Sequence, residues 1–256
     1  MQPVSSSLTL THRPRPEIPD GLVTAWILLC CLLIFAMAVI GAVTRLTESG
    51  LSIMEWAPIV GIVPPLSHQE WERIFALYRQ IPEYRQINAG MTLEEFKSIF
   101  WWEWLHRFWG RTIAIVFALP FFWFLWSGRV GGPLAWKLGF ALLLGALQGA
   151  LGWYMVASGF AERTDVSQYR LVAHLALALV IYGWLLWIAF DGLAPAPVPS
   201  YGPRVWLLSR GLVAFLILMA VVLAAGGFVA GLNAGLTYNT FPLMDGRWIP
   251  EGYGIL

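Results

Sequence analysis

The amino-acid sequence predicts an all-α protein, a polytopic bundle of transmembrane helices. Of its 256 residues, 58% are hydrophobic and only 12% are charged, whereas about 25% of the residues in a typical soluble domain are charged. Five segments each contain the roughly 20 apolar residues that an α-helix needs to cross a bilayer. The 15 tryptophans suit helices with interfacial belts. The net charge of +1 gives no reason to expect a nucleic-acid partner, and the lipid bilayer is the expected environment.

The expected spans are residues 22–43, 101–126, 138–157, 171–190 and 211–232. The first could be a signal peptide, but it is long and lacks a convincing cleavage site, so we expect it to be retained. Residues 45–100 form a long loop, in which capping boxes at residues 67–70 and 92–95 predict two amphipathic helices. We expect the second of these helices to continue into the 101–126 span.

Lysines and arginines in short loops predict a cytoplasmic N-terminus, in a multi-pass protein of the cell inner (plasma) membrane. The residues that this orientation places on the inner side are Arg13, Arg15, Arg129, Lys137, Arg204 and Arg210. The outer side carries more lysines and arginines in total, but most of these lie in the long first loop. Positive charges in long loops say little about membrane orientation. In either orientation the second and fourth spans run the same way. His106 and His174, each about one turn inside the N-terminal end of its span, should therefore share one membrane depth.

A short internal repeat divides the chain into two regions. Residues 41–46 and 49–51, at the end of the first span, are similar to residues 227–232 and 234–236, at the end of the fifth. Such repeats are typical of membrane proteins built from similar halves. We therefore expect residues 1–195 to form a four-helix half that carries the chemistry. Residues 196–256 should begin a second half, with its remaining spans and a further histidine pair beyond Leu256.

The second span concentrates polar groups on one face. At 100° per residue, an arc of about 140° contains Glu103, His106, Arg107, Gly110 and Arg111. The fourth span shows a similar pattern at a spacing of four residues, with Arg170, His174 and Ala178. Ionisable groups at membrane depth are costly and normally face the interior of a bundle. The small residue four positions after each histidine leaves room for a flat macrocycle.

Two histidines on facing helices are able to ligate a heme iron from both sides. We therefore expect His106 and His174 to be the axial ligands of a heme between these helices. The propionates of such a heme would pair with planar guanidinium groups, for which the candidates are Arg107, Arg111 and Arg170. Glu103, close to the edge of the macrocycle, could act as a general base or stabilise developing positive charge.

Plainer interpretations of the same residues stay open. A membrane histidine is a satisfied polar group about as often as it is a ligand, and Glu103 could simply pair with Arg107 at i, i+4 spacing. His12 and His68 are expected to be solvated, in a tail and a loop helix. The tryptophans at positions 101, 102 and 104 are better explained by an interface belt than by a cofactor site.

Several segments of the chain resemble the heme A synthase family. These are GAVTRLTESGLS at residues 41–52, EWLHR at 103–107 with Gly110 and Arg111, QGALGWYM at 148–155, the His174 span, and GLTYNTFPLMDG at 235–246. The resemblance extends over nearly the whole chain and is most specific in the EWLHR segment. The long first loop without cysteines is similar to the alphaproteobacterial and mitochondrial branch of the family.

The resemblance implies eight helices in two similar halves, and oxidation of a methyl group of the substrate heme O to the formyl group of heme A. By the same resemblance Glu103 is catalytic, His106 and His174 ligate the heme O iron, and heme b is held by a second histidine pair beyond this chain. Heme O synthase and cytochrome oxidase assembly factors are the implied partners, and a homo-oligomer is left open. The alternatives are a bis-histidine b-type electron-transfer cytochrome, which would not need Glu103, and a heme-binding assembly or carrier protein, which would bind without turnover.

Overall fold

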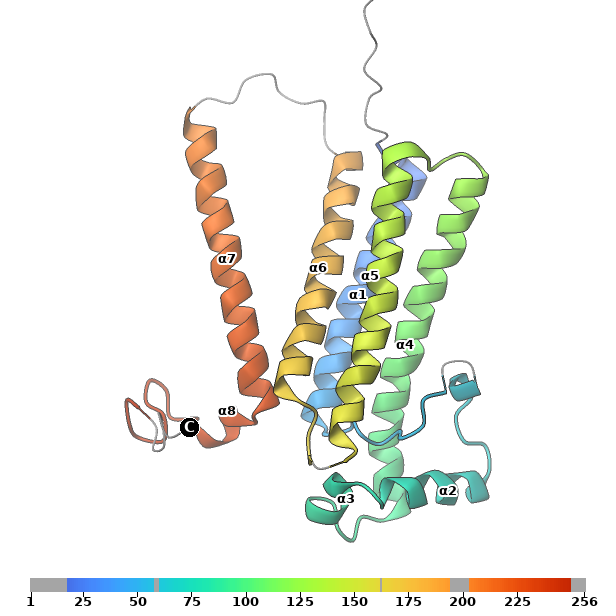
Figure 1. Ribbon diagram of the computed structural model, residues 1–256, viewed down its shortest axis with the longest axis vertical. Helices are drawn as coiled ribbons and strands as arrows, with labels where there is room; N and C mark the ends of the chain where they lie inside the picture. The colour runs from blue at the N-terminus through green and yellow to red at the C-terminus, as the bar shows by residue number, and fades with distance from the viewer. Residues whose placement is uncertain (1–17, 58–59, 162, 194–202, 250–256) are drawn as a thin grey trace, which may run out of the picture.

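The computed structural model describes residues 18–57, 60–161, 163–193 and 203–249. Within these ranges the chain is all-α, with five long apolar helices that could each cross a membrane (Figure 1). They are α1 (Gly21–Leu46), α4 (Leu93–Trp126), α5 (Gly132–Val156), α6 (Gln168–Leu193) and α7 (Pro203–Gly231). The predicted spans and fold class are thus confirmed. His12, Arg13, Arg15 and the proline-rich residues 194–197 lie outside the described residues.

Short helices fill the connections at one end of the bundle. They are η1 (Val60–Ile62), α2 (His68–Tyr78), α3 (Pro82–Gln86), η2 (Ala157–Gly159) and α8 (Ala234–Thr237). Figure 1 shows α2 and α3 lying across the foot of the long helices, beside the start of α4. We call this end, where α1, α5 and α7 finish and α4 and α6 begin, the α2–α3 end.

The helix starts follow the capping chemistry of the sequence. Thr92 and Glu95 form the predicted capping box, and α4 then continues without a break from Leu93 through the whole second span. The predicted box at the start of α2 is only half formed. The Ser67 side chain accepts a hydrogen bond from the Glu70 amide, but the Glu70 carboxylate accepts from Arg73 instead of returning to Ser67.

Four of the long helices form a bundle in which α1 packs against both α4 and α6, and α5 packs against α6. One apolar core lies between these helices and includes Ile27, Leu138 and Leu185, all almost fully buried. A second core, built around Phe75 and Phe96, fixes α2 and α3 to the first turns of α4. The α2–α3 end is therefore a packed part of the fold.

The fifth long helix is joined to the bundle at its C-terminal end. Figure 1 shows α7 leaning away from α6 at its start and approaching it near α8. Arg45, near the end of α1, donates hydrogen bonds to Asp165, to the Ala230 carbonyl and to the Asn233 side chain at 3.1, 2.8 and 2.6 Å. Asn233 also donates to Asp165 at 2.8 Å. The two segments that resemble one another in sequence thus contact each other in space.

Candidate functional site

The two predicted ligand histidines lie near the α2–α3 end, on helices that flank α1. His106 is in the fourth turn of α4 and His174 in the second turn of α6. Both side chains are partly buried. Because α4 and α6 both begin at this end, the two residues are in the same part of the bundle, as the directions of the spans predicted.

Each imidazole lies against a glycine of a neighbouring helix. A Cβ atom added to Gly41 of α1 would come within 3.4 Å of His106 Nε2, and one added to Gly152 of α5 would come within 3.0 Å of His174 Cε1. Any larger side chain at these positions would meet the ring directly. Gly110, which we expected to leave space beside a macrocycle, instead faces Met37 of α1, whose Cε would be 3.5 Å from an added Cβ.

Gln148 of α5 contacts His174 from the same side as Gly152. Its Nε2 donates to the His174 carbonyl at 3.0 Å and lies 3.3 Å from His174 Nε2. The Gln148 Oε1 and the His174 Nδ1 are buried without a hydrogen-bond partner. Because a buried polar atom without a partner is costly, this pair of atoms indicates a site where a further polar group is expected.

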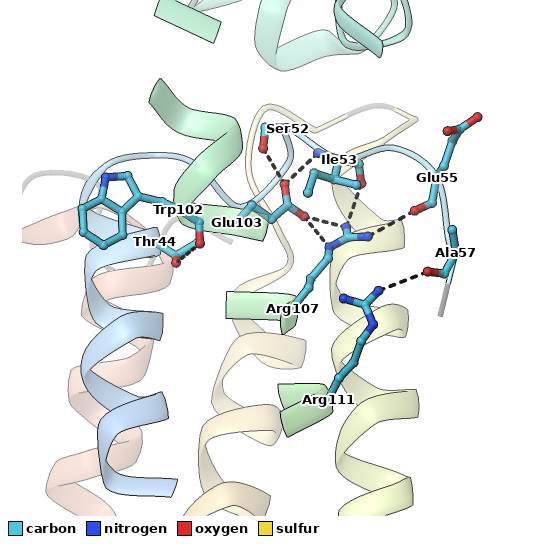
Figure 2. A network of polar contacts seen from close by, with 9 residues as sticks. All are labelled: Thr44, Ser52, Ile53, Glu55, Ala57, Trp102, Glu103, Arg107 and Arg111. Carbon is cyan, nitrogen blue, oxygen red and sulfur yellow. Dashed lines mark hydrogen bonds and ion pairs between the residues drawn. The ribbon is translucent and has the colours of Figure 1, made fainter. Parts of the chain in front are cut away.

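Glu103 is held by four hydrogen bonds at the start of the membrane-spanning part of α4 (Figure 2). Ser52 Oγ and the Ile53 amide both donate to its Oε2 at 2.7 Å. Arg107 donates to Oε1 through Nε at 3.0 Å and also through Nη2. The carboxylate is only 3% exposed. All of its acceptor directions are therefore used by a buried network that fixes its position.

Arg107 extends the same network to the loop that follows α1. Its Nη2 donates to the Ile53 carbonyl at 2.7 Å and its Nη1 to the Glu55 carbonyl at 3.1 Å. Arg73 of α2 donates to both carboxylate oxygens of Glu55 at 2.8 Å, and these bonds lower the pKa of Glu55. The i, i+4 pair of Glu103 and Arg107 is thus formed, and it ties this loop to α4.

The other two candidate arginines lie apart from one another. Arg111, one turn beyond Arg107, donates to the Ala57 carbonyl at 3.1 Å (Figure 2). Arg170 donates to the Tyr154 carbonyl at 2.6 Å and its guanidinium lies 3.6 Å above the Tyr154 ring. The structure therefore brings Glu103, Arg107 and Arg111 to one side of α4, whereas Arg170 lies between α6 and α5.

The described residues fit a porphyrin site better than a bare metal site. No group of three or more His, Cys, Asp or Glu side chains in the described ranges could hold a metal ion. Two imidazoles from different helices lie beside glycines at one end of the bundle, and one ring nitrogen has no hydrogen-bond partner. This donor set suits axial ligation of a heme iron.

Residues outside the predicted set complete the site. Ser52 positions Glu103, Gln148 contacts His174, and Gly41 and Gly152 make room for the rings. All four lie in segments that resemble the family, and Gly41 also lies in the internal repeat. The spacing of Gln148 and Gly152, four residues apart on α5, is the one local signal that could have placed both on the face opposite His174.

Comparisons with known proteins identify the family of this chain. The family described as cytochrome oxidase assembly protein (COX15-CtaA) matches residues 24–255. The chain is 52% identical over 232 residues to a heme A synthase of Nitrosospira multiformis, covering 89% of this chain and 64% of the relative. It is 54% identical over 248 residues to a heme A synthase of Rhodospirillum centenum, covering 96% and 66%.

A heme A synthase of Mesorhizobium japonicum is 48% identical over 257 residues, covering 100% of this chain and 69% of that relative. No solved structure matches the chain. The chain therefore spans about two thirds of the length of the relatives that it matches. On the match over residues 24–255, the chain belongs to the cytochrome oxidase assembly protein family, COX15-CtaA, together with these heme A synthases.

Proposed function

We propose that this protein acts as a heme A synthase, which oxidises a methyl group of heme O to the formyl group of heme A for cytochrome oxidase biogenesis. One observation carries the proposal. His106 and His174 come from two helices at the same end of the bundle, and each ring lies against a glycine. The similarity to heme A synthases supports the choice of substrate and product.

In this proposal His106 and His174 are the axial ligands of the substrate heme. Two imidazoles hold the iron from opposite faces and thereby fix the position of the ring edge that carries the methyl group. Gln148 positions His174, because its amide contacts both the main chain and the ring of that residue. The heme b cofactor, which would carry electrons away, is assigned to a part of the protein outside the bundle of α1, α4, α5 and α6.

We assign the catalytic role to Glu103. A carboxylate with its four acceptor directions filled is pre-organised, so little reorganisation is needed when positive charge develops on the substrate. Proton uptake at Glu103 would require one donor, such as Ser52, to move away from its Oε2. Arg107, Arg111 and Arg170 are the proposed partners of the heme propionates, because a planar guanidinium pairs with a carboxylate in a bidentate way. Arg107 also donates to Glu103.

The proposed setting is the cell inner membrane with the N-terminus in the cytoplasm, which puts the α2–α3 end on the outer side. A product for cytochrome oxidase needs a supplier of heme O and an acceptor of heme A. Heme O synthase and cytochrome oxidase assembly factors are therefore the proposed partners.

The experiment is heme analysis in a host that makes heme O but no heme A. The intact protein, its His106→Ala variant and its His174→Ala variant are expressed at matched levels, and the extracted hemes are separated chromatographically. We expect a formyl heme with the unsubstituted protein and none with either variant. Bound heme without any formyl product would identify an electron-transfer cytochrome or a carrier instead.

A further inference from the structure

The His174 ring has one nitrogen that suits a heme iron. Nδ1 lies next to the ring carbon that joins the main chain, so a macrocycle bound there would collide with α6 itself. Nε2 lies at the far side of the ring and is a common metal-ligating atom. In the structure this atom faces the side-chain amide of Gln148 on α5, whose Nε2 lies 3.3 Å away. Gln148 therefore contacts His174 at the atom that an iron would need.

The orientation of the Gln148 amide decides which atom donates in this contact. Its Nε2 also donates to the His174 main-chain carbonyl at 3.0 Å. Because a carbonyl only accepts, the amide nitrogen and not the amide oxygen must point toward His174. The NH2 group is a donor without acceptor capacity. His174 Nε2 must therefore accept the second hydrogen bond with its lone pair, and this is the lone pair that an iron would take.

The other contacts of the His174 ring also hold it against α5. The ring lies over Gly152, one turn after Gln148, where an added Cβ would be 3.0 Å from Cε1 and 3.6 Å from Nδ1. Nδ1 is buried without a hydrogen-bond partner. A metal-ligating histidine normally donates this second N–H to a carboxylate, a carbonyl or water, which orients the ring and makes it a stronger ligand. His174 is thus engaged at its ligating nitrogen and lacks support at the other one.

His106 has no such competitor for its ring nitrogens. In the part of the chain that the structure describes, no hydrogen bond to the His106 ring is formed. Its Nε2 lies against Gly41 of α1, which has no side chain that could donate. The two proposed ligands therefore differ in how tightly they are expected to hold an iron, and His174 is the weaker one.

We propose that Gln148 makes His174 an exchangeable ligand of the substrate heme, while His106 holds the heme in place. The proposal rests on the heme ligation assigned under the proposed function. When the His174 ring moves to α5, its bond from Nε2 to iron breaks and the hydrogen bond from Gln148 to Nε2 forms. No proton or electron moves in this exchange. The heme face beside α5 is then able to take a small molecule, which two histidine ligands would exclude because they fill both axial positions of the iron.

Carbon monoxide reports this exchange without any turnover, because it binds reduced heme iron only after one histidine has left. Its binding rate is measured anaerobically, by absorption spectroscopy, on the intact purified protein loaded with heme O. Gln148→Leu removes the amide donor and leaves a side chain of similar size. Gln148→Asn keeps the amide but is one CH2 group too short to reach Nε2. Gln80→Leu is the matched control, since Gln80 is exposed just after α2 and donates only to the Ala76 carbonyl.

Gln148→Leu should slow carbon monoxide binding by about fivefold, which is the factor that one ordinary hydrogen bond supplies. Gln148→Asn should slow it in the same direction, and Gln80→Leu should leave it unchanged. His174→Ala, which removes the exchangeable ligand, should give the fastest binding of the series. Unchanged or faster binding in both Gln148 variants overturns the proposal, because the amide would then not compete with the iron for His174.

Heme A formation by the same preparations separates this proposal from the proposed function. Gln148 is a positioning residue that acts through His174, so Gln148→Leu should lower the rate of heme A formation by about the same factor as carbon monoxide binding. Heme A from the unsubstituted protein, with carbon monoxide binding that does not depend on Gln148, overturns the exchange and leaves heme A synthesis intact. Slower carbon monoxide binding in Gln148→Leu, with no heme A from the unsubstituted protein, overturns the proposed function and leaves the exchangeable ligand.

Discussion

Replacing Glu103 with glutamine should destabilise the protein far more than an ordinary i, i+4 ion pair suggests. An exposed helical pair contributes only about 0.2–0.5 kcal/mol. Here the carboxylate is 3% exposed and its partner Arg107 is 18% exposed. The carboxylate also accepts from Ser52 and from the Ile53 amide. The change therefore removes a buried charge from a site built entirely of donors.

The hydrogen bonds around Glu103 determine how much free energy of unfolding the substitution removes. A glutamine side chain must point its NH2 group either at Arg107 or at the Ser52 and Ile53 donors, so donors face donors in both orientations. Removing one partner of a buried ion pair costs about 3–5 kcal/mol. Arg107 keeps its bonds to the Ile53 and Glu55 carbonyls. We therefore expect Glu103→Gln to lower the free energy of unfolding by about 3 kcal/mol, at the lower end of that range.

The assay compares two substitutions on the same helix. Glu94, also on α4, is 79% exposed and pairs with Lys97 at i, i+3, so Glu94→Gln should cost less than about 1 kcal/mol. Thermal unfolding and bound heme are measured for both variants in detergent. Heme A yield is then normalised to the folded, heme-containing fraction, so that a loss of stability is not counted as a loss of catalysis.

Two results would refute this reasoning separately. If Glu103→Gln unfolds at the same temperature as Glu94→Gln, the buried network does not stabilise the loop as we infer. If Glu103→Gln makes heme A at the normal rate per folded molecule, Glu103 is not catalytic and its role is confined to the network. We expect both a lower unfolding temperature and a normalised yield reduced by about 10²-fold or more.

Three further predictions concern the site and its supports. Gly152→Ala should displace His174 and alter the heme absorption spectrum, because the new Cβ would lie 3.0 Å from the ring. Gly149→Ala is the control and should leave the spectrum unchanged, because its new Cβ would meet nothing within 4 Å. Absorption spectra of the purified variants distinguish the two. His106→Ala should lower the heme content itself, as measured by pyridine hemochrome, while normal heme content would exclude it as a ligand. Arg45→Gln should increase proteolysis near the start of α8, because it removes a charged link between α1 and that segment, and an unchanged digestion pattern would contradict this.

The spans could be predicted from the sequence because each is a long apolar run, and a bilayer needs a helix of that length. The start of α4 was also predictable, since Thr92 and Glu95 form a local capping box. The half-formed capping box at Ser67 was not predictable, because Arg73 competes with the Ser67 amide for the Glu70 carboxylate. Glu70 accepts from Arg73, and Arg73 is drawn toward Glu55, which is distant in sequence.

The directions of the spans were enough to predict that His106 and His174 lie at one end of the bundle. Individual contacts were predictable only within a single helix. The spacing of Glu103 and Arg107 showed that they could pair, but it could not show that Ser52 closes the network, because the loop after α1 has no periodicity. The glycines beside the rings belong to α1 and α5, so their role depends on how those helices pack.

The pairing of Glu103 with Arg107 within one helix has a consequence for biogenesis. Charged residues oppose the insertion of a helix, by about 2.5–3.5 kcal/mol on translocon-based scales when they lie at its centre and by less toward its ends. Because both members of the pair belong to α4, they can neutralise one another before any other helix has arrived. The helix is therefore able to enter the translocon with Glu103 and Arg107 already paired. Its loop partners are added only as the α2–α3 end folds outside the membrane, so insertion of α4 does not have to wait for assembly of the site.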